Sequence, residues 1–146
     1  VWKETEPGAP GPMARLEAMQ FLVENGINAG VSMAPILPGL SDSPESINAV
    51  VEAAANHGAR FLSANLLFLK PGSKEWFMPM IRESHPNLAP GYAQLYRKTY
   101  APQDYTRSVL KVVEEARVRW GLLAPKPPRL LPGPQMQGQM ELALTA

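Results

Sequence analysis

Residues 30–69, GVSMAPILPGLSDSPESINAVVEAAANHGARFLSANLLFL, contain two short apolar segments with an amphipathic segment between them. The outer segments are rich in the small, β-branched and aromatic residues that are typical of strands. The middle segment repeats apolar residues at helical spacing after Pro44 and ends at Gly58, which suits the left-handed stop of a helix. This order predicts a strand, a helix and a second strand. Strands joined in this way run parallel.

The same pattern begins one unit earlier. PGPMARLEAMQFLVENG predicts an amphipathic helix, with Pro12 in its first turn and Gly26 at its end. Gly26 and Gly58 are 32 residues apart, which indicates a repeated helix–strand unit in an α/β fold. Two parallel strands alone leave edges and faces unprotected, so we expect more strands before Val1. The expected buried stripes are Met13, Leu16, Met19, Gln20 and Val23 in the first helix, and Ile47, Val50, Val51 and Ala54 in the second.

Composition limits the function classes. The 146 residues have the length of one domain, and 14 basic against 13 acidic residues give no strong charge that would attract nucleic acid or a membrane surface. Cysteine is absent, which excludes disulfides, thiolate metal ligands and cysteine nucleophiles within these residues. No apolar run approaches the roughly 20 residues that span a bilayer, and no signal-peptide pattern opens the sequence. We therefore expect a soluble cytoplasmic protein whose first residues continue an earlier element.

Three further helices are predicted after the second strand. Trp76, Phe77, Met80 and Ile81 could pack the first of them, which Pro79 strains unless it lies near an end. The stripes of the other two are Tyr92, Leu95 and Tyr96, and then Val109, Val112, Val113, Ala116 and Trp120. The Pro- and Gln-rich residues 124–146 predict a disordered tail. The expected division is therefore an α/β part in residues 1–70, a helical extension in 71–123 and the tail.

Strand parity separates a bulky face from a small or polar face. Val31 and Met33 oppose Ser32 and Ala34, and Ser63 and Asn65 oppose a bulky apolar set. That apolar set is Leu62, Ala64, Leu66 and Phe68. We expect helices to cover the apolar faces and the small polar faces to line an interior that admits a ligand. Alternatively, the polar side chains only hydrogen-bond inside a packed barrel.

Ligands of parallel α/β folds bind at the carboxyl ends of the strands. Residues 35–42 and the KPGS stretch, residues 70–73, are expected there. Pro35 and Pro38 restrict the first connector before anything binds, which lowers the entropy cost of forming a ligand site. The alternative is a rigid cover that touches no ligand.

Isolated polar residues give weaker signals. Glu6 and Arg15 flank the loop before the first helix, which also lies at the carboxyl ends, although exposed side chains of these types are usually only solvated. His57 and His85 have no metal-ligand companion at suitable spacing and are interpreted as structural. No Gly-rich phosphate loop and no Ser/His/Asp set can be built from spacing.

The segments EPGAP, RLEAM followed by NGI, and APILPGLSDSPE together resemble the carboxyl half of radical S-adenosylmethionine proteins. The similar branch is that of spore photoproduct lyase, often called DNA repair photolyase-like. LKPGSKEWFMPMIRESHPNLAPGYAQLYRKTYAPQDY is similar to an actinobacterial sub-branch, so the resemblance covers about residues 2–120. No single motif is decisive; the order and spacing of the motifs carry the likeness.

The resemblance implies that this chain is the last two strands and helices of a partial (β/α)6 barrel. In this family a CxxxCxxC loop holds a [4Fe–4S] cluster, and S-adenosylmethionine on that cluster yields a 5′-deoxyadenosyl radical that abstracts hydrogen from the substrate. This chain has no cysteine, so the motif is expected upstream, the missing N-terminal half of the barrel is the expected partner, and the chain alone is expected to be inactive. A lesion in DNA is the substrate that the likeness suggests.

The family's last strands contact the adenosine of the cofactor through backbone groups and small side chains. By resemblance the contacts here are Ser32, Ala34, Pro35, Ser63, Asn65 and Leu67. Glu6 and Arg15 match the family's EPG...R pattern without an assigned role. No catalytic residue and no metal ligand of this chain is predicted.

Two other interpretations stay open. The chain could be a cluster-free α/β binding or scaffolding module without catalysis. The segment QMELAL, from Gln139 to Leu144 in the tail, weakly resembles the peptide by which bacterial repair proteins dock on the sliding clamp. Met140 and Ala143 replace the leucine and the aromatic anchor of that peptide.

Overall fold

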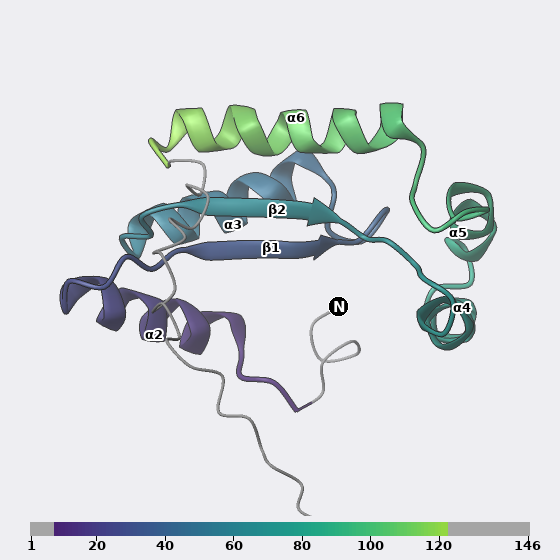
Figure 1. Ribbon diagram of the computed structural model, residues 1–146, viewed down its shortest axis with the longest axis horizontal. Coiled ribbons are helices and arrows are strands. Elements are labelled where there is room, and N and C mark those ends of the chain that lie inside the picture. Colours follow the sequence, from purple (N-terminus) through teal and green to yellow (C-terminus); the bar gives the residue numbers. More distant parts are fainter. Residues whose placement is uncertain (1–7, 123–146) are drawn as a thin grey trace, which may run out of the picture.

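The computed structural model describes residues 8–122, which form a mixed α/β fold (Figure 1). Two parallel strands lie side by side, α3 and α6 pack against them, and α4 and α5 lie beyond their carboxyl ends. The elements in chain order are α2 (Pro12–Glu24), β1 (Val31–Ile36), α3 (Pro44–Asn56), β2 (Leu62–Leu66), α4 (Ser73–Ser84), α5 (Ala89–Leu95) and α6 (Gln103–Arg119). None of these helices is long and apolar enough to cross a membrane.

The predicted strand, helix and strand are confirmed, and β1 and β2 pair in parallel. Val31 pairs with Leu62 and Ser32 with Ser63, but the register shifts between Met33 and Ile36. The shift contains Pro35, which has no N–H to give to the ladder. Its peptide bond with Ala34 is cis. The ladder therefore ends irregularly just where the connector to α3 begins.

Helix α3 begins and ends as its sequence predicts. Ser43 is the N-cap, because its Oγ accepts the N–H of Ser46 at 3.1 Å. Asp42 instead accepts the N–H of Gly39 at 2.7 Å, within the connector. Gly58 has a φ of 74°, the left-handed conformation expected of it. Local chemistry thus fixes the length of the crossover between the strands.

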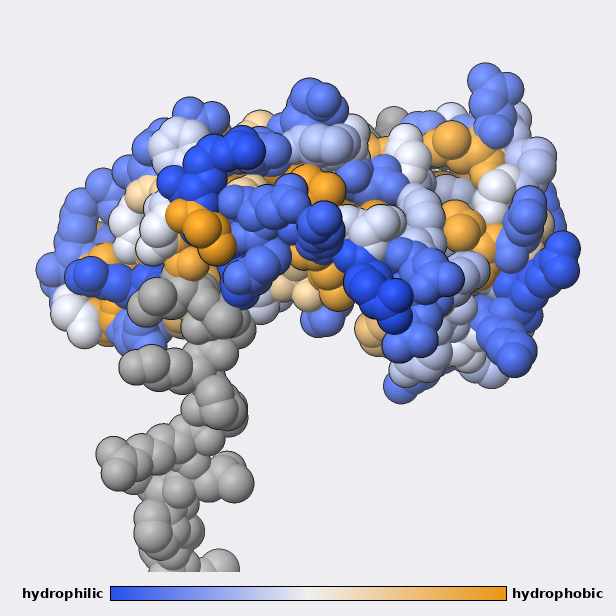
Figure 2. Space-filling model, turned by 90° about the horizontal axis from the view of Figure 1, so that it is seen from above, coloured by the Kyte–Doolittle hydropathy of each residue, from blue (hydrophilic) through white to orange (hydrophobic). Residues whose placement is uncertain are grey.

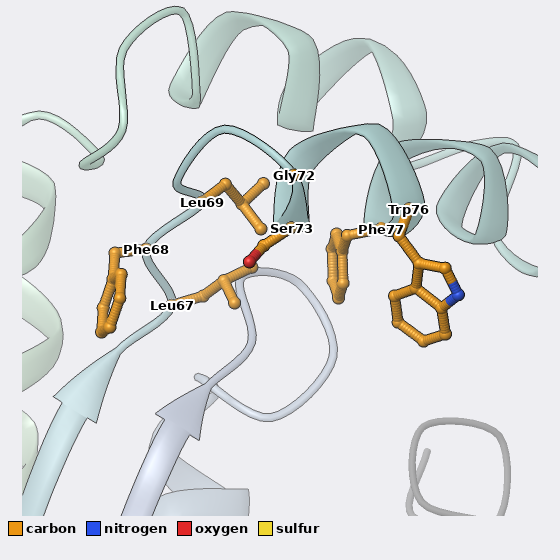
Figure 3. Close-up of a pocket in the computed structure, with 7 residues that line it drawn as sticks. All are labelled: Leu67, Phe68, Leu69, Gly72, Ser73, Trp76 and Phe77. Carbon is orange, nitrogen blue, oxygen red and sulfur yellow. The ribbon is translucent and has the colours of Figure 1, made fainter.

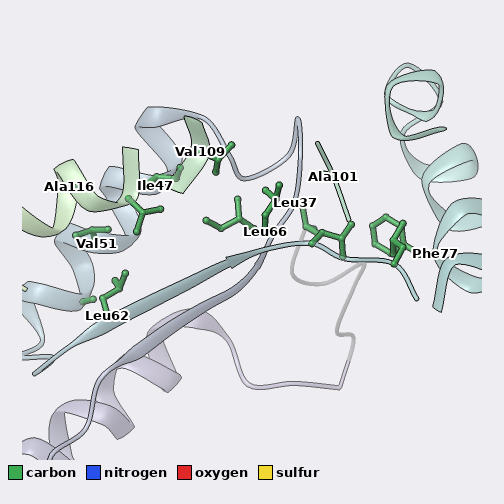
Figure 4. Packing of buried hydrophobic residues seen from close by; sticks show 14 of the residues in the cluster. Leu37, Ile47, Val51, Leu62, Leu66, Phe77, Ala101, Val109 and Ala116 are labelled. Atoms are coloured by element: carbon green, nitrogen blue, oxygen red, sulfur yellow. The ribbon is translucent and has the colours of Figure 1, made fainter. Parts of the chain in front are cut away.

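The core lies between the sheet and the two helices α3 and α6. Leu62 is fully buried against Ile47 and Val51 of α3, and Val109 and Ala116 of α6 close the same cluster. Figure 4 shows this row of side chains continuing along the sheet, through Leu66 and Leu37, toward Phe77 of α4. Each buried side chain of this size contributes about 1.5–3 kcal/mol. The core therefore joins the α/β part to the helical extension.

Some predicted core residues lie at the surface. Met13, Val50 and Trp76 are 55%, 41% and 64% exposed. In α3 the contact face is centred on Ile47, Val51 and Ala54, which leaves Val50 at its rim. In α4 the buried residues are Phe77, Met78 and Ile81.

Pro79 lies in the interior of α4, away from both ends, and the helix continues through it. The Pro79 side chain is exposed, so its ring takes no place in the core, although its missing N–H leaves the helix one backbone hydrogen bond short. The predicted tail, residues 124–146, lies outside the described residues, and the proposed division at residues 70 and 123 stays a prediction.

Candidate functional site

The two faces of the sheet differ as strand parity predicts. Leu62 and Leu66 are buried beneath the helices, whereas Ser32, Ala34 and Asn65 are exposed and Ser63 is half-buried. The hydroxyl of Ser63 donates to that of Ser32 at 3.1 Å, directly across the paired strands. The small polar side chains therefore form one surface, and most of it is open in the described residues.

The parity prediction is wrong beyond the end of β2. Phe68 was expected on the same face as Leu66, but its side chain is 46% exposed and its ring lies 5.7 Å from that of Tyr100. The strand ends at Leu66, and Leu67 turns inward. Alternation holds only while the backbone stays extended.

Leu67 differs from the other predicted cofactor contacts. Its N–H donates to the Ile36 carbonyl at 2.9 Å, and its carbonyl accepts the Tyr96 hydroxyl at 2.8 Å. Both backbone groups are therefore already satisfied, and its side chain is 8% exposed. A ligand at this position would meet the side chain of Leu67 and not its backbone.

Strand β1 runs to Ile36, so the connector is residues 37–42 and not residues 35–42 as predicted. It is held from the side of the helical extension. The Tyr92 hydroxyl donates to the Pro38 carbonyl at 2.8 Å, and the Tyr105 hydroxyl donates to the Asp42 carboxylate. Inside the connector, the N–H of Leu37 donates to Ser41 Oγ at 2.8 Å. These bonds hold the connector through groups of the chain itself. Pro35, near the end of β1, is exposed.

Burial decides the protonation of these tyrosines. Desolvation raises the pKa of Tyr92, Tyr96 and Tyr105 far above the usual value, and the Asp42 carboxylate adds to the rise at each of them. For Tyr105 the hydrogen bond to Asp42 contributes as well. The three hydroxyls therefore stay protonated and act as hydrogen-bond donors, which suits positioning and not acid–base chemistry.

The remaining polar candidates are dispersed. Arg15 is exposed, and its Nε donates to the Pro10 carbonyl at 2.9 Å in the loop before α2. Figure 1 shows that α2 begins toward the carboxyl side of β1, as expected. His57 caps α3, where its Nδ1 lies 2.7 Å from the Ala53 carbonyl oxygen, and His85 caps α4. Glu6 lies outside the described residues.

Metal ligation finds no support in the part of the chain that the structure describes. No group of three His, Cys, Asp or Glu side chains within residues 8–122 is placed to hold a metal ion. The chain also has no cysteine. These residues therefore do not fit an iron–sulfur cluster, whereas the small polar sheet face can still receive an organic ligand.

The outer edge of β2 is covered. Arg117 of α6 donates from Nη1 to the Leu62 carbonyl at 3.2 Å, and the N–H of Leu69 donates to the Thr99 carbonyl at 2.8 Å. Phe68 and Tyr100 form an antiparallel bridge just beyond the strand. Figure 2, which looks onto α6, shows mainly hydrophilic side chains on this side of the molecule.

The outer edge of β1 has no partner strand within residues 8–122. The N–H of Val31 bonds to the Phe61 carbonyl, so the alternation of a parallel ladder turns the backbone groups of Ser32 and Ala34 toward the open edge. On the preceding helix, Phe21 is 64% exposed, and Ile27 after it is 51% exposed. The open edge of β1 therefore follows directly in the chain after the exposed apolar side chains of Phe21 and Ile27.

A shallow pocket of about 480 Å³, which is widely open to solvent, lies just beyond the carboxyl ends of the strands (Figure 3). It includes Gly72 and Ser73 of the predicted KPGS stretch, which confirms the expected place of that stretch. Its complete lining is Leu67, Phe68, Leu69, Gly72, Ser73, Trp76 and Phe77. Sequence reasoning missed Phe68, Trp76 and Phe77 here because their apolar character predicted core packing.

Comparison with known proteins gives relatives without an assigned activity. No protein-family model and no solved structure matches the chain. Proteins of Mycobacterium tuberculosis and Mycobacterium bovis, both named only as uncharacterized, are 31% identical to it over 130 residues. The match covers 86% of this chain and 38% of each relative. The chain therefore spans well under half the length of the curated relatives it matches.

Proposed function

We propose that this chain is the carboxyl-terminal part of a radical S-adenosylmethionine enzyme whose barrel resembles that of spore photoproduct lyase. The observation that carries the proposal is the asymmetry of the parallel sheet. Its apolar face is covered by helices, whereas the opposite face presents Ser32, Ala34 and Asn65 in the open. A parallel sheet that is wrapped on one face only fits the wall of a barrel whose interior binds a ligand.

The open face suits the adenosine part of the cofactor. Ser32 and Ser63 provide hydroxyls, Asn65 an amide, and Ala34 and Pro35 a surface without bulky side chains. These groups would hydrogen-bond the nucleoside and let it approach the backbone closely. Leu67 would add an apolar contact only, because both of its backbone groups are taken. Arg15, next to the loop before α2, remains a candidate, and Glu6, which lies outside the described residues, remains one by resemblance alone.

The iron–sulfur cluster must be held elsewhere, because the chain contains no cysteine. When bound, the cluster and S-adenosylmethionine supply a radical that removes hydrogen from the substrate. The residues of this chain would bind and orient the cofactor and exclude water. Alone, the chain is proposed to be inactive.

The partner that we propose is the N-terminal half of the same barrel. A further parallel strand would pair with the open edge at Ser32 and Ala34, and apolar side chains next to it would cover Phe21 and Ile27. The greater length of the mycobacterial relatives leaves room for such a half. Mycobacteria are actinobacteria, which agrees with the sub-branch that the helical extension resembles. We propose a cytoplasmic location.

A DNA lesion is the substrate class that we propose for the whole enzyme, by analogy with spore photoproduct lyase. The net charge of +1 adds no attraction for DNA, so a basic surface would have to come from the other half. Docking on the sliding clamp through Gln139 to Leu144 is a weaker proposal, and that segment lies outside the described residues.

The deciding experiment is to sequence the DNA upstream of the codon for Val1. We expect a CxxxCxxC motif in the same reading frame, and a reading frame without one would overturn the proposal. The complete protein, reconstituted anaerobically with iron and sulfide, should bind S-adenosylmethionine and release 5′-deoxyadenosine on reduction. Ser63→Val should weaken cofactor binding, measured by calorimetry, and leave the visible absorption of the cluster unchanged. Thr106→Val is the control, because the Thr106 hydroxyl donates to the carbonyl of Pro102, the N-cap of α6, away from the open sheet face.

A second candidate is a cluster-free binding or scaffolding module. It is favoured by the absence of cysteine and by the hydrogen bonds within the chain that hold the connector. It predicts that the 146-residue chain is monomeric, unfolds cooperatively and ignores S-adenosylmethionine. The barrel proposal predicts association through the open edge of β1. Sedimentation of the purified chain distinguishes the two.

A further inference from the structure

The pocket beyond β2 has a rigid apolar floor. Leu67, Leu69 and Phe77 are 8%, 2% and 7% exposed. Leu67 is fixed through its backbone bonds to Ile36 and Tyr96, and the ring of Phe77 lies 5.7 Å from that of the buried Tyr92. This floor is therefore formed before any ligand arrives, which lowers the entropy cost of binding.

The walls of the pocket are aromatic and remain in contact with water. Figure 3 shows Phe68 on one side and Trp76 on the other, with Leu67 and Phe77 between them. Tyr100 packs against Phe68 at 5.7 Å and supports its ring. Large exposed aromatic rings that face one pocket favour a flat ring that stacks on them.

The polar groups at this pocket limit the ligand further. No lining residue is charged, and Ser73 provides the one side-chain hydroxyl. Lys70 holds its ammonium 5.8 Å from the centroid of the Phe68 ring, beside one wall. The Glu75 carboxylate accepts the N–H of the lining residue Gly72 and keeps its negative charge, so an anion is favoured only on the side of Phe68, near the Lys70 ammonium.

We infer that this pocket binds a planar aromatic ring that carries an anionic substituent, with the ring over the floor of Leu67 and Phe77 on the side of Trp76, and the anion on the side of Phe68, near Lys70. The inference goes beyond the proposed cofactor role, because only Leu67 belongs to both sets of residues. It assigns a second ligand site at the carboxyl end of the sheet. A nucleotide and an aromatic carboxylate share the required chemistry.

Calorimetric titration of the full chain tests the inference with two anionic probes, thymidine 5′-monophosphate and naphthalene-2-acetate. Their neutral counterparts, thymidine and naphthalene-2-acetamide, measure the contribution of the charge. Tighter binding of thymidine 5′-monophosphate indicates a nucleotide as the ligand, and tighter binding of naphthalene-2-acetate indicates an aromatic carboxylate. Saturable binding of at least one anionic probe is expected, and no binding of either at millimolar concentration overturns the inference.

Substitutions then locate the bound probe. Trp76→Ala should weaken binding roughly 5- to 150-fold, the usual loss when one stacking aromatic side chain is removed. Trp76→Phe should restore part of that loss, because it keeps a ring. Val118→Ala, 72% exposed on α6, is the control and should bind as the unchanged protein does. Equal binding by Trp76→Ala and the unchanged protein contradicts the proposed position of the ring.

Charge is tested separately at Lys70. Lys70→Gln should weaken the anionic probes and leave the neutral ones unaffected, and added salt should reduce the difference. Equal losses for anionic and neutral probes would contradict the role of the ammonium. The far-ultraviolet circular dichroism of each variant checks that it is folded. If the probes do not bind, the proposed cofactor role is unaffected, because it is tested by cluster reconstitution and by S-adenosylmethionine binding.

Discussion

The two edges of the parallel sheet differ: the edge at β2 is covered by other parts of the chain, and the edge at β1 is open in the described residues. Beside β2, Arg117 of α6 donates to the Leu62 carbonyl, which points away from β1. Val109 and Ala116 of the same helix are buried against the sheet. Beside β1, the backbone groups of Ser32 and Ala34 meet no strand of the described residues. The difference shows that the described residues cover the sheet edge at β2 and leave the edge at β1 open, which is where the proposed N-terminal half of the barrel would pair.

The covered side should dominate the stability of the chain. Leu62→Ala removes a fully buried side chain and should lower the free energy of unfolding by about 2–5 kcal/mol. Ser63→Ala, the next residue on the open face, should change it by less than about 0.5 kcal/mol. Urea denaturation followed by circular dichroism measures both. Similar losses at the two positions would contradict the assignment of the faces.

The open side should dominate association. Phe21→Glu places a charge on the exposed apolar surface of α2 and should weaken self-association of the purified chain roughly 10- to 100-fold, given the usual contribution of one buried Phe. Val118→Glu makes the same change on α6, on the covered side, and should have little effect. Analytical ultracentrifugation compares them. An equal effect of the two substitutions argues against the β1 side as the interface.

The helical extension should stabilise the connector through its hydroxyls. Tyr92→Phe leaves the buried Pro38 carbonyl without its donor, so we expect a loss of about 1–3 kcal/mol in the free energy of unfolding. Tyr100→Phe alters a hydroxyl on a side chain that is 65% exposed and should be nearly neutral. Thermal unfolding of both variants, at equal ionic strength, gives the comparison. A neutral Tyr92→Phe means that the connector is held by packing alone.

Alkaline pH should affect the same tyrosines. Burial raises their folded-state pKa, so the folded chain favours the protonated hydroxyls. Their contribution is complete below the unfolded-state pKa of about 10 and is lost as pH rises from there through the folded-state pKa. The melting temperature should therefore fall above about pH 10. Tyr92→Phe should make that fall shallower, and an unchanged slope contradicts the prediction.

The smallest effect is expected at the covered edge itself. Arg117→Met should cost about 0.5–1.5 kcal/mol, because one hydrogen bond to the Leu62 carbonyl is lost while the apolar stem is kept. The side chain of Arg117 is 15% exposed and also pairs with Glu114. Arg107→Met, which breaks an exposed pair with Asp104, should be neutral. Chemical denaturation distinguishes these outcomes if the two variants are measured side by side.

Local sequence signals predicted the elements and the ends of the helices α2 and α3, but not the ends of the strands. Gly26 and Gly58 adopt the left-handed conformation expected at helix ends, and Ser43 caps α3. These features depend on backbone geometry and on hydrogen bonds between near neighbours, which a short stretch of sequence specifies by itself. The small polar face of the candidate site followed from the same local alternation.

Contacts between distant residues were not predictable in this way. The hydroxyls of Tyr92 and Tyr96 reach carbonyls 54 and 29 residues away, and Arg117 reaches one 55 residues away. A tyrosine at helical spacing indicates burial and gives no partner for its oxygen. The exposure of Trp76 was missed for the same reason, because only the tertiary arrangement decides which face of α4 meets the core.

The sequence by itself therefore determined a parallel strand–helix–strand unit, its capping residues and the polarity of its two faces. Only the tertiary structure decided that Leu67 turns inward, that Phe68 and Trp76 form the walls of a pocket, and that one sheet edge is covered while the other is open. The physical reason is the range of the interactions. Backbone conformation and periodicity are local, whereas burial and edge pairing depend on segments that meet only when the chain is folded.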